Sequence, residues 1–86
     1  MAIAPTPVIA LNRAVALAEV EGPEAALAAI EKLSLDGYYL FHAIRADLFE
    51  RLEQRAAAKR AYERAIALTE NRAERTFLRS KLERIA

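Results

Sequence analysis

Apolar residues recur along the chain at the three- and four-residue spacing of a helix face, in segments separated by turn residues. The pattern predicts five helices and no strand, because no stretch of β-branched residues alternates with polar ones. The predicted helices cover 7–21, 23–33, 38–52, about 54–69 and 71–86. Their inward faces are expected to hold Val8, Leu11, Val15, Ala18, Ala26, Leu27, Ile30, Leu33, Phe41, Ile44, Leu48, Leu52, Ala58, Ala61, Tyr62, Ala65, Leu68, Phe77, Leu78, Leu82 and Ile85.

Helix-boundary signals fall between these segments. Thr6 and Pro7 suit the cap and the first position of a helix, and Gly22 with Pro23 predicts a sharp reversal. Residues 34–37 form a predicted turn, and Asn71 with Glu74 has the spacing of a capping box. No proline or glycine separates the third helix from the fourth, so their boundary, near 53–54, is the least defined.

Small and apolar positions repeat at a fixed distance. Ala26 and Ile30 recur 32 positions later as Ala58 and Tyr62, and the pair Arg13-Ala14 recurs as Arg45-Ala46. Small residues at matched positions let successive helices pack closely, which is how helix-hairpin repeats stack.

We therefore expect an all-α fold of five antiparallel helices in one domain spanning 1–86. Residues 1–6 form a lead-in, 7–34 and 38–69 form two helix hairpins, and 71–86 forms a terminal helix whose charged outer face caps the stack. The first helix is apolar on nearly every side, so it lacks a neighbour. Either a preceding helix has been removed, making the chain a fragment, or a second copy covers the face in a homodimer.

Composition excludes several kinds of protein. A net charge of +1 gives no reason to expect direct DNA binding, and no apolar run reaches the roughly 18 residues of a membrane helix. The absence of cysteine removes disulfides and thiolate metal sites and fits a cytoplasmic protein. Residues 72–86 carry five basic and two acidic side chains, which reads as a solvated final helix or as a contact for an acidic partner.

The residues predict no enzyme. His42 is the only histidine and has no second ligand or placed partner, so we expect no catalytic, metal-binding or cofactor-binding residue and no cofactor. Glu19, Glu21 and Glu24 lie at an exposed bend and lack the apolar pocket that acid–base carboxylates need.

Binding of a partner is the remaining possibility for the polar residues. Arg13 and Arg45 hold equivalent places in the two repeats, so together they could grip a carboxylate or an acidic peptide, with Asn12 and His42 nearby. Tyr39, adjacent to Tyr38 and expected to point to another side, could offer its ring to a peptide. The alternative is that each arginine bridges to a glutamate on the adjacent helix and only fixes the hairpin.

The hairpins resemble tetratricopeptide repeats. The best match is Ala58-x-x-x-Tyr62-x-x-Ala65, preceded by Ala46 and Phe49 at the small and aromatic positions. Departures from the motif are a period of 32 in place of the usual ~34, histidine at 42 for tryptophan, glutamate at 53 for glycine and glutamate at 70 for proline.

A second resemblance covers nearly the whole chain. The stretches PTPVIALNRAVA (5–16), LDGYYLFHA (35–43), AYERA (61–65) and NRAER (71–75) are similar to the C-terminal extension of a group of bacterial extracytoplasmic-function sigma factors. In that group a tetratricopeptide-like domain follows the DNA- and polymerase-binding domains. The resemblance implies a fragment of a transcription initiation factor, with the rest of the sigma factor or core RNA polymerase as partner.

The leading hypothesis is therefore a non-catalytic protein-interaction module of a sigma factor. Two alternatives stay open: a ligand-sensing domain with a pocket between the first, third and fifth helices, and a homodimerisation element built on the first helix.

Overall fold

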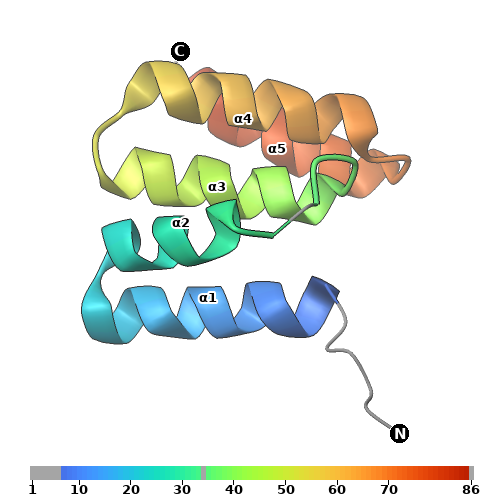
Figure 1. The fold of residues 1–86 in the computed structure, drawn as a ribbon. Helices are drawn as coiled ribbons and strands as arrows, with labels where there is room; N and C mark the ends of the chain where they lie inside the picture. The colour runs from blue at the N-terminus through green and yellow to red at the C-terminus, as the bar shows by residue number, and fades with distance from the viewer. Residues whose placement is uncertain (1–6, 34, 86) are drawn as a thin grey trace, which may run out of the picture.

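The computed structural model describes residues 7–33 and 35–85. Within these ranges the chain is all helical, with no strand, as expected from the sequence. The helices are α1 (Pro7–Glu21), α2 (Pro23–Glu31), α3 (Tyr39–Arg51), α4 (Arg55–Leu68) and α5 (Arg72–Ile85). Figure 1 shows them stacked in chain order as antiparallel neighbours, with α5 lying against α4. The first two pairs are the predicted hairpins, and α2 joins them by packing on α3.

The turns explain why the helices end where they do. Gly22 has φ 98° and ψ 162°, a conformation that only glycine adopts without strain, and Pro23 then opens α2. The helix α2 ends two residues earlier than predicted, because Leu33 N–H bonds the carbonyl of Ile30 in a tighter turn at 2.9 Å. The predicted cap at Thr6 lies outside the described residues.

The boundary between α3 and α4 is a hydrogen-bonded reversal centred on Glu53. Gln54 N–H bonds the Phe49 carbonyl at 2.9 Å, and Glu53 N–H bonds the Glu50 carbonyl at 3.0 Å. This is the Schellman arrangement that ends many helices, with Glu53 at φ 59° in the left-handed position usually taken by glycine. The reversal thus forms without the glycine or proline that sequence reasoning looks for.

Half of the predicted capping box forms at the start of α5. Glu74 N–H donates to Asn71 Oδ1 at 2.9 Å. The backbone N–H of Asn71 faces Thr69 Oγ1 at 3.3 Å in place of the Glu74 carboxylate, so the reciprocal bond is not made.

Two apolar clusters hold the helices together. One joins α1, α2 and α3, and the other joins α3, α4 and α5. The alanines at the helix crossings are fully buried, which confirms the close approach predicted from the repeat: Ala26, Ala46, Ala58 and Ala65 are each 0% exposed. No helix of the described part is long and apolar enough to cross a membrane.

Two residues predicted to face inward are exposed instead. Val15 on α1 is 41% exposed and Phe77 on α5 is 56% exposed. Both residues line an open groove. The spacing of apolar residues therefore identified the apolar face of each helix but did not show whether another helix covers that face. The side chain of Val8 lies outside the described part. On α1, Ile9 and Val20 are also exposed, which agrees with the expectation that this helix has an uncovered face.

Candidate functional site

An apolar groove of about 210 Å³ runs over α3 between α1 and α5. Its floor comes from one face of α3, where residues spaced three and four apart point the same way. Its walls come from α1 and α5, with the ring of Tyr62 from α4 beneath. The lining residues are Val15, Ala18, Ala43, Ile44, Asp47, Leu48, Arg51, Tyr62, Phe77, Leu78 and Lys81.

Phe77 is the most prominent apolar side chain of the groove. More than half of its surface is open to solvent, and the Lys81 ammonium lies 5.2 Å from the centre of its ring. A cation over an aromatic face is attracted to it, so Lys81 and Phe77 offer a charged group and a ring side by side. A partner that covered Phe77 would bury a large apolar area.

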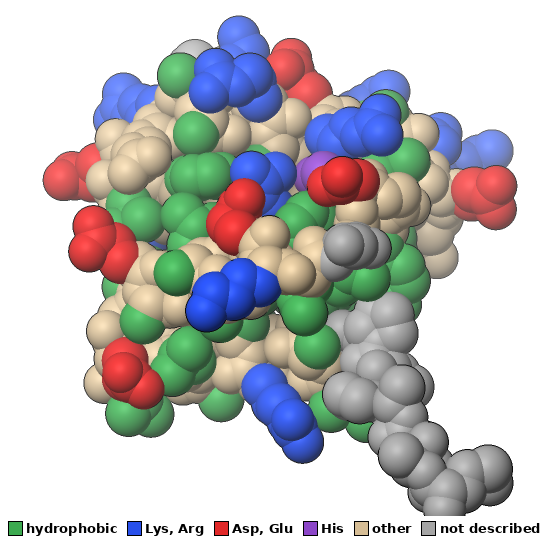
Figure 2. Space-filling model, in the orientation of Figure 1, with side chains coloured by type: hydrophobic (Ala, Val, Ile, Leu, Met, Phe, Trp, Pro, Cys, Tyr) green, Lys and Arg blue, Asp and Glu red, His purple; other side chains and the backbone are tan. Residues whose placement is uncertain are grey.

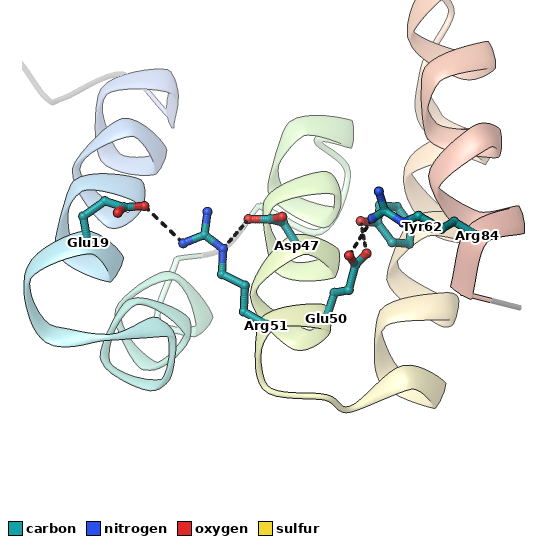
Figure 3. A network of polar contacts seen from close by, with 6 residues as sticks. All are labelled: Glu19, Asp47, Glu50, Arg51, Tyr62 and Arg84. Atoms are coloured by element: carbon teal, nitrogen blue, oxygen red, sulfur yellow. Dashed lines mark hydrogen bonds and ion pairs between the residues drawn. The ribbon is translucent and has the colours of Figure 1, made fainter.

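Arg51 spans the edge of the groove between α1 and α3. Its Nη1 lies 3.2 Å from Glu19 Oε1 on α1, and its Nε lies 3.1 Å from Asp47 Oδ2 one turn back on α3 (Figure 3). The hydrogen bond to Glu19 and the nearby Asp47 carboxylate raise the pKa of Arg51. Because all three side chains are substantially exposed, these pairs set orientation more than stability.

A second set of contacts ties α3 to α4 and α5. The Tyr62 hydroxyl donates to Glu50 Oε1 at 2.9 Å, and Arg84 Nη2 donates to Glu50 Oε2 at 2.6 Å (Figure 3). Burial of the ring and the hydrogen bond to Glu50 raise the pKa of Tyr62 well above the ordinary range of tyrosine. One carboxylate thereby links three helices that frame the groove.

Comparison with known proteins identifies the repeat. Residues 4–86 match the family described as "Tetratricopeptide repeat-like domain". The chain belongs to the tetratricopeptide repeat-like family. Domains of this kind generally mediate protein–protein interactions, because their stacked helices form concave binding surfaces. They are generally not catalytic.

The relatives of this tetratricopeptide repeat-like domain carry less information about its role. It is 45% identical over 84 residues to the uncharacterized protein R00370 of Rhizobium meliloti (strain 1021), a match that covers 95% of this chain and 20% of that protein. The chain thus spans about a fifth of its relative's length. No solved structure matches it. Neither comparison names a transcription factor, so the sigma-factor assignment stays a prediction.

The tetratricopeptide repeat-like domain does not place the predicted partner-binding residues around one site. Asn12 and Arg13 are exposed on α1 and do not line the groove. Arg45 is held elsewhere: its Nε donates to Glu31 Oε1 on α2 at 2.5 Å, which is the alternative considered for it. Its guanidinium also lies 5.4 Å from the ring centre of Phe41. For Arg45, therefore, a role in joining the two hairpins is visible in the structure.

Tyr39 lies half-buried at the start of α3, outside the groove. Its ring centre is 6.5 Å from that of Tyr38, with 24° between the planes, so the adjacent tyrosines stack and do not point to different sides as expected. Desolvation, followed by the carboxylate of Glu74 and then Tyr38, raises the pKa of Tyr39.

His42 is buried, and its Nε2 lies 2.7 Å from the backbone carbonyl of Asp36. Together with Arg45 it lines a second, more polar cleft, in which Arg60 and Arg64 of α4 also take part. Sequence reasoning missed these two arginines. The available signal was their like charge at i and i+4, which isolated helices disfavour.

No metal site is visible in the part of the chain that the structure describes: no three histidine, cysteine, aspartate or glutamate side chains gather closely enough to hold an ion. Among the polar residues of the groove, Arg51 and Tyr62 join neighbouring helices through Glu19 and Glu50.

Proposed function

We propose that this domain is a non-catalytic interaction module of a bacterial sigma factor and that it acts in transcription initiation. In this proposal the groove over α3 receives an apolar segment from the rest of the sigma factor or from core RNA polymerase. The observation that carries the proposal is the exposed Phe77, set in an apolar groove of a repeat fold whose members bind proteins.

The groove is better suited to side chains of a protein partner than to a free small molecule. Its volume of about 210 Å³ lies below the ~300–1,000 Å³ of typical small-molecule pockets. A pair of apolar side chains presented by a helix or an extended segment would fill it, as in helix-in-groove recognition. Asp47, Arg51 and Lys81 would then meet polar groups at the rim of the contact.

The sigma-factor part of the proposal is supported by the four sequence stretches described above and by the relative's length. A match that covers 20% of the relative indicates a module within a larger protein. A sigma factor acts in the bacterial cytoplasm, and its promoter-reading helices would lie in other parts of the polypeptide. The 86-residue chain is accordingly expected to bind protein and not promoter DNA.

A matched pair of variants tests the groove. Phe77→Ala removes a large exposed ring inside the groove, whereas Val20→Ala removes an exposed apolar side chain outside it, where the valine is 83% exposed. The probes are purified bacterial core RNA polymerase and, separately, the remainder of the full-length polypeptide. We expect Phe77→Ala to weaken binding to one probe at least about tenfold, as for a central aromatic contact, and Val20→Ala to change it little.

Three possible results distinguish between the sigma-factor proposal, the groove as contact surface and a homodimer through α1. Binding to neither probe would contradict the sigma-factor proposal. Equal effects of the two substitutions would contradict the groove as the contact surface. Self-association that Val20→Ala abolishes and Phe77→Ala does not would favour the homodimer through α1. Because Phe77 is largely exposed, its replacement leaves most of the folding free energy intact, so loss of binding is separable from unfolding.

A further inference from the structure

A second cleft, of about 380 Å³, lies away from the groove between α3, α4 and the turn that precedes α3. It shares no lining residue with the groove. In Figure 2 a small part of the histidine, which is 6% exposed, is visible among Lys or Arg and Asp or Glu side chains. The cleft is lined by Asp36, His42, Arg45, Phe49, Ala57, Arg60, Ala61 and Arg64.

Two arginines of this cleft are unpaired. Arg60 and Arg64 are exposed one turn apart on α4, where like charges repel, and neither forms an ion pair with a residue that the structure describes. Arg45, in contrast, is neutralised by Glu31. Asp36, in the turn that precedes α3, contributes one negative charge to the cleft. The cleft therefore keeps an excess of positive charge with donors left over.

His42 adds an unsatisfied atom. Because its Nε2 faces a carbonyl oxygen, which can only accept, that nitrogen carries a proton and donates. Its Nδ1 is buried and has no hydrogen-bond partner among the described residues. Buried polar atoms are almost always paired, so an orphan beside a charged cleft calls for an explanation. His42 lines the cleft, so a ligand hydroxyl that reached this atom would supply the missing donor.

We propose that this cleft binds a small phosphate monoester, with the guanidinium groups of Arg60 and Arg64 holding the phosphate oxygens. Guanidinium groups match phosphate oxygens in a two-pronged geometry. A monoester carries about −1.5 to −2 charges on three acceptor oxygens, enough to use both arginines, whereas a carboxylate brings one charge. The cleft volume leaves room for an organic group over Phe49 and the two alanines.

Histidine NMR gives a direct readout, because His42 is the only histidine of the chain and its ring protons give one set of signals. Inorganic phosphate, glycerol 3-phosphate and phosphoserine are titrated at constant ionic strength, with glutarate as the carboxylate comparison. We expect saturable shifts of the His42 signals with the phosphates and not with glutarate. Tighter binding of glycerol 3-phosphate than of inorganic phosphate would identify a phosphate monoester as the ligand of the cleft. Tighter binding of inorganic phosphate would contradict the monoester and identify the free ion as the ligand.

Variants that remove equal charge inside and outside the cleft distinguish specific binding in the cleft from general electrostatic attraction. Arg60→Gln with Arg64→Gln is expected to weaken phosphate binding at least about tenfold, as for lost charge-assisted hydrogen bonds. The control, Arg72→Gln with Arg79→Gln on α5, removes the same charge from outside the cleft and should leave binding within about twofold. Asp36→Asn should strengthen phosphate binding, because it removes the negative charge from the cleft. Equal losses in both double variants, or equal responses to glutarate and phosphate, would overturn the proposal.

Discussion

Replacing Glu53 by glycine should stabilise the domain. Glu53 lies just after the end of α3 at φ 59°, where an L-residue with a Cβ crowds the following carbonyl at a cost of about 1–2 kcal/mol. Its side chain is exposed and forms no hydrogen bond or ion pair with a described residue, so nothing visible offsets this strain. Glycine removes the strain but gives the unfolded chain more freedom, which costs about 0.5–1 kcal/mol. The net expectation is a gain of about 0.5–1 kcal/mol.

Thermal unfolding followed by far-UV circular dichroism measures the effect. For a domain of this size 1 kcal/mol corresponds to about 4–8 °C, so Glu53→Gly should raise Tm by about 2–8 °C. Urea unfolding should move the midpoint without changing the slope, because the surface exposed on unfolding is unchanged.

Two further substitutions at the same position isolate the cause. Glu53→Ala removes the side chain but keeps Cβ in the left-handed region, so its stability should stay within about 0.5 kcal/mol of the parent. Asn tolerates this region better than most residues, so Glu53→Asn should fall between alanine and glycine. If glycine proved no more stable than alanine, backbone strain at this turn would not be the reason that the tetratricopeptide motif prefers glycine there.

Other turns, the core and the buried tyrosine give independent tests. Gly22→Ala should cost about 1–3 kcal/mol because of the glycine-only backbone at φ 98°, whereas Gly37→Ala, with no atom within 4 Å of its new methyl group, should cost almost nothing by thermal melting. Ala58→Leu should cost about 1–3 kcal/mol by overpacking a fully buried position, and Ala67→Leu, exposed on the same helix, should not. The raised pKa of Tyr62 means that its contribution is complete below the unfolded-state pKa near ~10 and is lost as pH rises further. In urea unfolding at increasing pH, the stability difference between the parent and Tyr62→Phe should therefore hold below pH ~10 and shrink above it; a constant difference would contradict the shift.

The sequence predicted the parts of the fold that depend on neighbours along the chain. Glycine followed by proline at 22–23 and the asparagine at 71 identified helix boundaries, and the matched alanines identified the helix crossings. These features succeed because backbone conformation and small side-chain size act locally. The reversal at 53 could be located only approximately, because its Schellman hydrogen bonds form without the usual glycine.

The candidate sites depend on which helices meet, and the pattern of residues along the chain does not specify that. Phe77 has the spacing of a core residue, yet its exposure follows from the opening of the groove. Arg13 and Arg45 are equivalent in the repeat, but Glu31 draws Arg45 toward α2. Arg60 and Arg64, which join Arg45 and His42 in a cleft, come from α4, and neither the repeat period nor the net charge predicts that these side chains meet.

The helix α3 separates the two candidate surfaces. Residues 43, 44, 47, 48 and 51 face the groove, whereas residues 42, 45 and 49 face the cleft, and on a helix of 3.6 residues per turn these sets lie on nearly opposite sides. Because α3 packs against α1, α2 and α4, the two surfaces stay apart. Substitutions on α5 that block a protein partner should therefore leave the cleft intact, and substitutions on α4 that remove its arginines should leave the groove intact. Each proposal can accordingly fail without the other.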